Sequence, residues 1–266
     1  MADTHTLIAS LSLGSSLAYG DLSISRDGLT AYIRLSATPY TIRSVVMSVP
    51  WDITTGTLTA SGVGINGAEG LFINTPGNYL YIAGPSFTVR QYSLSGDLST
   101  MTLIRSKAFS LSGTTYLVSC FFSDDGNVMV LGYIPTTGGA KISKYDLTVP
   151  WDIDSAILSH TVTLSTGGNP YLWISRQGRR ILYVSGSFIY KHDFSTPWDF
   201  TTGILSEANP ISMYAPDGIF CNYNEDVVYT CGRITQYGDF GINSYTITPV
   251  GLTFWTNFHN QSEILS

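Results

Sequence analysis

A seven-residue segment recurs five times along the chain, and this repeat constrains the fold more than any other feature of the sequence. The copies begin at Ile42, Val89, Ile142, Ile189 and Ile242, so the period is about 50 residues. Within each copy apolar residues lie two positions apart, as Tyr145 and Leu147 do in the third copy, and this spacing predicts a β-strand.

A second recurring unit lies upstream of each copy and predicts a β-hairpin. Each unit is a strand, a tight turn and another strand. The turns are rich in glycine and Asx residues, which supply the positive φ that two-residue turns need. The five turns are Asp27-Gly28, Pro76-Gly77, Asp125-Gly126, Gln177-Gly178 and the degenerate Glu225-Asp226. One position of the strand after the turn carries Tyr32, Tyr81, Val130, Tyr183 and Tyr229. One hairpin is therefore used five times.

Three of the five copies are followed by Pro-Trp-Asp, at Pro50–Asp52, Pro150–Asp152 and Pro197–Asp199. Proline cannot continue a strand ladder, so it ends the third strand, while aspartate favours a turn and tryptophan can cover the exposed end of the sheet. A fourth strand is expected after each motif, for example over 56–60 and 156–160. The second and fifth copies, near Gly96 and Pro249, lack the tryptophan.

Four strands with a period near 50 residues predict one blade of a β-propeller. The chain is therefore expected to be all-β, with residues 1–266 forming a single domain, a five-bladed β-propeller of four-stranded antiparallel blades. The N-terminal stretch 4–13 is expected to close the ring by completing the last blade. Closure by the C-terminal strand 251–255 is the alternative, and an open solenoid is disfavoured because it would show distinct polar end repeats.

Composition excludes several classes of protein. Only 12% of the residues are charged, the formal net charge is −6, and no basic block is present, so nucleic acid is not expected as a partner. Neither a signal peptide nor an apolar run of about 18 residues is evident, so neither export by a cleaved signal nor membrane insertion is expected. Cys120, Cys221 and Cys231 have no paired spacing and are expected to be small buried side chains.

No catalytic residue emerges from the sequence. Five-bladed propellers that hydrolyse glycosides need carboxylates on the inner strands. The inner-strand segments 22–25, 71–74, 121–123 and 172–175 contain none, and only Asp21 lies close by. The protein is therefore predicted not to be an enzyme, and glycoside hydrolysis is the least favoured function.

Metal and cofactor sites are not expected either. The four histidines are isolated from one another, at His5, His160, His192 and His259. The segment Asp124-Asp125-Gly126 lacks further oxygen ligands in series and is expected to be a turn instead of a calcium loop. The pair Arg179-Arg180 follows the same turn in the fourth repeat and is expected to be a solvated turn flank instead of an anion site.

Aromatic residues leave a binding function open. The chain has 17 Tyr and 5 Trp, and such rings can stack on sugars, but their recurrence at fixed positions of the repeat predicts packing between blades. The loops 35–40, 84–86 and 135–139 differ in length and chemistry, so five equal sugar sites are not expected. The ligand-binding residues stay unknown at this stage.

The segments 144–153 and 194–203 combine the third strand with Pro-Trp-Asp, and this combination resembles a repeat of tailed-bacteriophage proteins, especially those of marine phages and cyanophages. The resemblance extends from about Asp21 to Ile247. It implies a propeller-type virion structural or adsorption component, located in the virion, with other virion proteins and a host cell-surface glycan as partners. A lectin-like carbohydrate-binding propeller is the alternative, and the place in the virion and the oligomeric state stay open.

Overall fold

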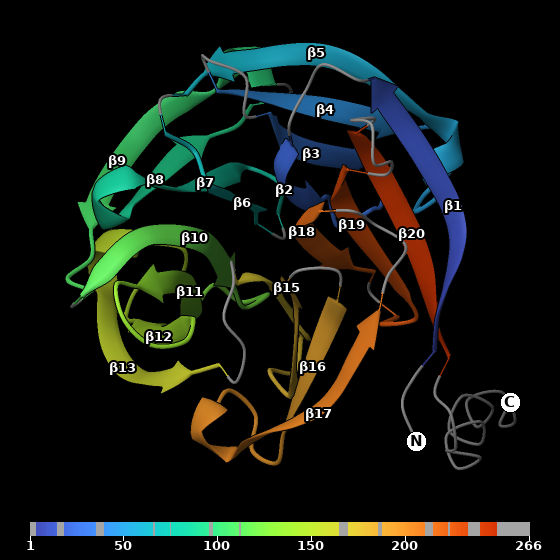
Figure 1. The fold of residues 1–266 in the computed structure, drawn as a ribbon. Helices are drawn as coiled ribbons and strands as arrows, with labels where there is room; N and C mark the ends of the chain where they lie inside the picture. The colour runs from blue at the N-terminus through green and yellow to red at the C-terminus, as the bar shows by residue number, and fades with distance from the viewer. Residues whose placement is uncertain are drawn as a thin grey trace, which may run out of the picture.

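The computed structural model describes residues 4–14, 19–35, 40–65, 67–74, 76–95, 98–111, 113–164, 170–185, 188–210, 215–222, 224–233 and 240–248. These residues form five four-stranded antiparallel sheets arranged in a ring around a central axis (Figure 1). The prediction of a five-bladed β-propeller is therefore confirmed.

The four strands of each blade follow one another from the axis to the rim. The first blade consists of β2 (Tyr19–Ile24), β3 (Thr30–Leu35), β4 (Thr41–Met47) and β5 (Gly56–Gly64). The second consists of β6 (Gly70–Ile73), β7 (Tyr79–Gly84), β8 (Thr88–Ser93) and β9 (Thr102–Ala108). The third consists of β10 (Thr114–Phe122), β11 (Val128–Pro135), β12 (Lys141–Leu147) and β13 (Ala156–Thr163). The fourth consists of β14 (Tyr171–Ile174), β15 (Arg180–Ser185), β16 (Phe188–Phe194) and β17 (Gly203–Pro210).

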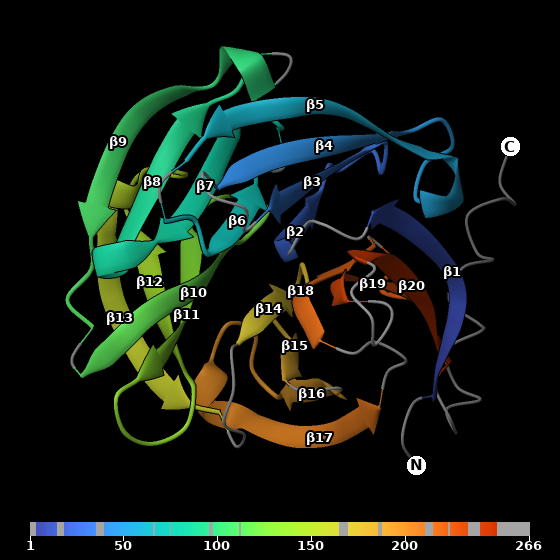
Figure 2. The same cartoon turned by 45° about the horizontal axis from the view of Figure 1, so that its top comes forward.

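The fifth blade contains both ends of the described chain, which lie side by side in Figures 1 and 2. It consists of β18 (Ala215–Cys221), β19 (Val227–Arg233), β20 (Phe240–Thr248) and the N-terminal strand β1 (Thr4–Gly14). Strand β1 pairs antiparallel with β20 from Thr4 opposite Thr248 to Gly14 opposite Phe240. Closure by the N-terminal strand is therefore confirmed, while the alternative strand 251–255 lies outside the described residues.

The inner strands β2, β6, β10, β14 and β18 line the axis, and each contacts the inner strand of both neighbouring blades. Every residue of β6 and of β14 is buried, because these strands are covered on both faces by adjacent blades. Such strands read as continuous apolar runs instead of an alternating pattern. Among the described residues, no helix is long and apolar enough to cross a membrane.

One small polar residue ends every inner strand and holds the hairpin turn that follows it. These residues are Ser25, Asn74, Ser123, Ser175 and Asn222. The side-chain oxygen of each accepts a hydrogen bond from the backbone N–H that opens the second strand, over 2.8 to 3.0 Å. The turns therefore share one geometry, and all five lie at the same end of the central channel.

Three short 3₁₀ turns, η1 (Ile53–Thr55), η4 (Ile153–Ser155) and η5 (Phe200–Thr202), follow the Pro-Trp-Asp motifs, and two others are η2 (Pro85–Phe87) and η3 (Leu98–Thr100). The three cysteines are free and buried, as predicted. Burial raises the pKa of the Cys221 thiol well above its ordinary value, which leaves that thiol protonated and unreactive.

Candidate functional site

The tryptophan of each Pro-Trp-Asp motif packs against the hairpin turn of its own blade and is hydrogen-bonded to it. Its backbone N–H donates to the carbonyl of the turn glycine, as from Trp151 to Gly126 over 2.9 Å, and its ring lies against that glycine so closely that a Cβ atom would overlap it. To reach this position Trp51, Trp151 and Trp198 adopt positive φ values of 66°, 65° and 59°. The repeated motif therefore serves as scaffold, as the sequence predicts.

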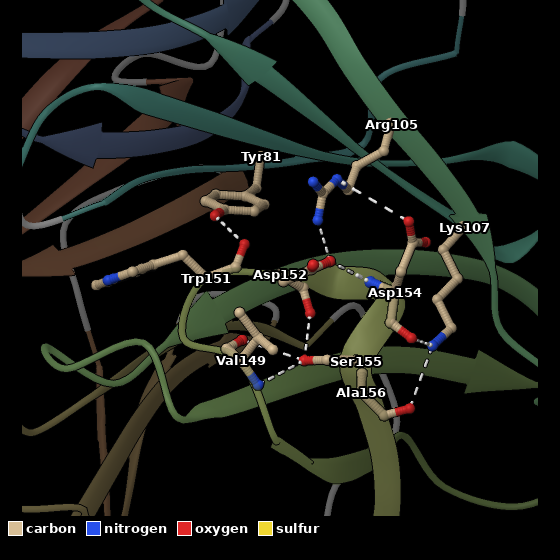
Figure 3. Close-up of polar contacts among 9 residues, drawn as sticks. All are labelled: Tyr81, Arg105, Lys107, Val149, Trp151, Asp152, Asp154, Ser155 and Ala156. Atoms are coloured by element: carbon tan, nitrogen blue, oxygen red, sulfur yellow. Dashed lines mark hydrogen bonds and ion pairs between the residues drawn. The ribbon is translucent and has the colours of Figure 1, made fainter.

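The same motif joins the second blade to the third, as Figure 3 shows. The Tyr81 hydroxyl donates to the Trp151 carbonyl over 2.7 Å, and the Arg105 guanidinium forms an ion pair with Asp152. Lys107 Nζ donates to the carbonyls of Asp154 and Ala156 over 3.0 and 3.2 Å. The hydrogen bond from Arg105 holds the pKa of Asp152 below its ordinary value, so this contact persists as a charged pair at neutral pH.

Trp51 is held in the same way by the blade before it. The Tyr229 hydroxyl donates to the Trp51 carbonyl over 2.5 Å, and the Trp51 ring contacts both Tyr229 and Phe220, with centroids 6.1 and 6.4 Å away. The predicted role of the recurring tyrosines in packing between blades is therefore confirmed for Tyr81 and Tyr229.

Trp198 differs from the other two tryptophans because the third blade carries Val130 where the second carries Tyr81. A valine at this position offers no hydroxyl to the Trp198 carbonyl, and the Trp198 ring lies beside that of Phe200, with centroids 6.5 Å apart. The blades are joined by His160 instead, whose Nε2 accepts from the Phe200 N–H over 3.3 Å. The Trp198 ring is left lining a hollow in the protein surface.

The hollow lies between the hairpin turns of the third, fourth and fifth blades and has a volume of about 500 Å³. Its lining consists of Ser123, Asp124, Asp125, Arg176, Gln177, Trp198 and Glu225. An aromatic ring beside carboxylates, an amide and a guanidinium is the mixture of groups that fixes a polar organic ligand in a pocket of this size. We therefore take the hollow as the candidate functional site.

Ion pairs organise the walls of the hollow. Arg176 of the fourth blade pairs with Asp124 of the third. Arg180 pairs with Asp193 over 2.9 Å in its own blade and with Glu225 of the fifth over 3.5 Å. The lining holds three carboxylates and one guanidinium, so the hollow attracts cationic groups, repels anions and accepts neutral polar groups without that repulsion.

Two of these carboxylates have displaced pKa values. Although partial burial opposes ionisation, hydrogen bonds from Ser123 and Asn127 lower the pKa of Asp125, which is therefore ionised at neutral pH. Burial raises the pKa of Glu225, and the neighbouring Arg180 opposes that rise.

Glu225 also occupies an unusual backbone conformation. It stands where the other four turns carry Gly28, Gly77, Gly126 and Gly178, and its φ is 60°. A side chain fits there because the fifth blade has no Pro-Trp-Asp tryptophan to cover the turn. The fifth turn therefore holds backbone strain at the edge of the hollow, where the other four turns have a glycine.

A narrow apolar recess of about 40 Å³ lies on the axis beside the hollow and shares Ser123, Asp124, Arg176 and Trp198 with it. Aromatic rings from four inner strands line the recess, namely Phe72, Phe121, Trp173 and Phe220. Phe72 and Phe121 pack edge to face with centroids 4.9 Å apart. At this end the central channel is therefore narrowed by side chains to a small recess.

A second polar cluster gathers where the inner strands begin, at the other end of the channel. Asp21 on β2, Asp217 on β18 and Tyr171 on β14 interact electrostatically with Arg34 on β3. Burial raises the pKa of Asp21 to about 8 and that of Asp217 to about 6, with Arg34 opposing both shifts. Arg34 pairs with Glu69 over 3.5 Å.

The carboxylate oxygens of Asp21 are both engaged by the backbone. One accepts from the Leu22 N–H over 2.8 Å, and the other accepts from the Leu71 N–H of the second blade over 2.7 Å. Asp21 thus joins two inner strands and has no oxygen free of a backbone hydrogen bond. Neither Asp217 nor Glu69 lies in the four inner-strand segments that were searched for carboxylates in the sequence. Asp217 lies in β18, the inner strand of the fifth blade, and an alignment of β18 with the other inner strands would have found it.

The structure also shows the surroundings of the 124–126 segment and of Arg179 and Arg180, which the sequence analysis singled out. Asp124, Asp125 and Gly126 form a turn, and no group of three or more His, Cys, Asp or Glu side chains suited to a metal ion occurs in the described ranges. The Arg179 side chain donates to the Ser195 carbonyl over 2.8 Å, as expected for a turn flank. Arg180 instead forms an ion pair with Glu225, which lines the hollow. The His5 side chain and all of His259 lie outside the described part of the structure.

Comparison with known proteins supports the fold alone. No protein-family model matches the chain. No curated protein matches its sequence. A functionally unknown protein from Desulfotomaculum acetoxidans DSM 771 is similar in structure, with a TM-score of 0.50 and 13% identity over 88% of this chain and 87% of that one.

Two further solved structures have TM-scores just below 0.5. The β-propeller domain of Cps50 (Swd1) from Myceliophteria thermophila has a TM-score of 0.48 and 11% identity, over 86% of this chain and 84% of that chain. Hydrazine synthase from Kuenenia stuttgartiensis has a TM-score of 0.49 and 14% identity over 85% of this chain, which spans 58% of that one. The class that the fold defines is the β-propeller, and these similarities do not assign a function within it.

Proposed function

We propose that this protein is a non-enzymatic binding propeller that recognises a neutral saccharide in the hollow between the third, fourth and fifth blades. The observation that carries the proposal is the placement of Trp198, the one Pro-Trp-Asp tryptophan whose ring lines this hollow. An aromatic ring packs well against the C–H face of a pyranose. The carboxylates around it can accept hydrogen bonds from hydroxyls, and the amide can both accept and donate them.

The charge of the lining favours a neutral sugar over an acidic one. Asp124, Asp125 and Glu225 outnumber Arg176, so a carboxylated or phosphorylated ligand would meet repulsion. Together with the resemblance of the Pro-Trp-Asp repeat to tailed-phage proteins, this points to a virion adsorption component that binds a host cell-surface glycan. Docking to other virion proteins would use the rest of the ring surface.

Two observations support a function without catalysis. The repeat residues are committed to turns and blade contacts, as the Tyr81 to Trp151 bond illustrates. At the opposite mouth, both oxygens of Asp21 accept backbone hydrogen bonds, which leaves that carboxylate without the freedom that a nucleophile or general base needs.

A glycan array probed with the wild-type protein and with two matched variants tests the proposal. Trp198→Leu removes the ring from the hollow, whereas Trp51→Leu removes the same residue, in the same backbone conformation, from a blade junction that does not line the hollow. We expect saturable binding to neutral glycans by the wild type and by Trp51→Leu, and at least a tenfold loss for Trp198→Leu.

Thermal unfolding of both variants provides the control for stability. Binding that is lost equally in the two variants, or no saturable glycan binding by the folded wild type, would overturn the proposal. The same samples are incubated with a panel of aryl glycosides, and hydrolysis that Asp217→Asn abolishes would establish an enzyme in place of a binding module.

A further inference from the structure

The apolar recess beside the hollow gives the proposed site a more specific ligand. We infer that the site selects a sugar carrying an acetamido group, an N-acetylhexosamine, with the pyranose over Trp198 and the acetyl methyl in the recess. This inference rests on the proposed function and deepens it, because the hollow and the recess share four lining residues and therefore adjoin each other.

The size and lining of the recess fit a methyl group. Its volume is about 40 Å³, which is enough for one methyl and too small for a sugar ring. The rings of Phe72, Phe121, Trp173 and Phe220 form its apolar wall, and a hydroxyl placed against that wall would lose its hydrogen bonds to water. An apolar substituent attached directly to a polar ring is therefore the best match.

Amide donors at the edge of the recess fit the acetyl carbonyl. Asn74 and Asn222 both line the recess and are 1% and 7% exposed. Each carboxamide nitrogen gives one hydrogen to its own turn, through Asn78 Oδ1 over 2.9 Å and Asp226 Oδ1 over 2.6 Å. A carboxamide has two N–H donors, so each side chain keeps one for a ligand oxygen within the described part of the fold.

The carboxylates around the hollow complete the recognition of an acetamido group. Its N–H is a donor, and Asp124, which lines both the recess and the hollow, is an acceptor at their junction. Across the hollow and the recess, the three carboxylates outnumber the two guanidinium groups of Arg26 and Arg176. Acidic acetamido sugars such as sialic acids are therefore disfavoured, and the selected class is the neutral N-acetylhexosamines.

Position 221 offers a substitution that fills the recess with a residue the fold already uses. Cys221 lines the recess from the fifth blade, and the equivalent inner-strand positions carry Ile24, Ile73 and Ile174 in three other blades. Cys221→Ile should therefore occupy the recess while leaving Trp198 and the hollow in place. Cys221→Ala is the matched control, because it enlarges the recess.

The test is calorimetric titration of the three proteins with the methyl glycosides of N-acetylglucosamine, N-acetylgalactosamine, glucosamine and glucose, and with N-acetylneuraminic acid. For the wild type and Cys221→Ala we expect an N-acetylhexosamine to bind at least about fourfold more tightly than glucose, the factor for burying one methyl group. For Cys221→Ile we expect that preference to vanish. Saturation-transfer NMR of the wild type should place the strongest effect on the acetyl methyl.

The possible failures are distinguishable. If no sugar binds, the proposed function falls. If sugars bind in a Trp198-dependent manner without preference for the acetamido group, or with a preference that Cys221→Ile leaves intact, the proposed function stands and the inference about the recess is overturned. If Cys221→Ile does not fold, a weak methyl signal in the wild-type NMR experiment is the result that overturns it.

Discussion

The fifth hairpin turn carries a glutamate where the other four carry glycine. The substitution Glu225→Gly measures how much this glutamate lowers the free energy of unfolding. A side chain held at a φ of 60° costs about 1 kcal/mol relative to glycine, even after the greater freedom of glycine in the unfolded chain is counted. The substitution also removes the ion pair to Arg180, whose atoms are 3.5 Å apart and whose side chains are 28% and 31% exposed. A partly exposed pair of this kind contributes about 0.5 kcal/mol.

The balance predicts that Glu225→Gly is more stable than the wild type by about 0.5 kcal/mol, with an increase in Tm of about 1 to 2 °C for a chain of this size. Urea unfolding with an unchanged m-value is the assay. Gly77→Ala is the matched control, because Gly77 has a φ of 74° and an added Cβ would meet no atom within 4 Å. That control isolates the backbone cost and should lose about 1 kcal/mol.

The same variant separates stability from function. Because Glu225 lines the hollow, Glu225→Gly should bind saccharide more weakly than the wild type while unfolding at a higher temperature. A less stable Glu225→Gly, or a neutral Gly77→Ala, would refute the assignment of strain to this turn. Tighter binding by Glu225→Gly would refute the role of the glutamate in the site.

Two further predictions concern the blade junctions. Tyr81→Phe should lose about 1 to 2 kcal/mol in the free energy of unfolding, measured in urea, because the Trp151 carbonyl loses its 2.7 Å hydrogen bond, and an unchanged stability would contradict the junction. Burial and Lys144 lower the pKa of His160 below 6.5, and Asp199 and Asp146 oppose this shift. Between the pKa of the folded protein and 6.5, the unfolded chain therefore binds more protons than the folded protein. The free energy of unfolding should fall as pH drops through that window. In His160→Gln that part of the pH dependence of Tm should flatten, and an unaltered pH profile would show that His160 is not its source.

The ring architecture is predictable from the sequence because each blade repeats the same local signals. The turn residues at Asp27-Gly28 and their counterparts, and the proline that ends each third strand, act within a few residues of one another along the chain. Closure by β1 is also predictable, because the stretch before β2 has the pattern of a fourth strand. Without it, the last blade would keep an unpaired strand edge.

The candidate site is less predictable because it forms where the copies differ. The sequence shows that Val130 replaces a tyrosine. It does not show that Trp198 therefore lines a hollow, because that depends on which blade each tryptophan contacts. The strain at Glu225 is likewise hidden, because the sequence shows a degenerate turn without its φ. Asp217 and Arg34 are 183 residues apart in numbering and come together only when the ring closes.

We propose that sugar binds in the hollow between the third, fourth and fifth blades. A crystal structure of the protein with a β-1,4-linked dimer of N-acetylglucosamine would locate the bound sugar. We expect a pyranose ring stacked on Trp198 with its acetyl methyl among Phe72, Phe121 and Trp173. A sugar bound at the opposite mouth near Asp217, or a hollow left without sugar at saturating concentration, would contradict it.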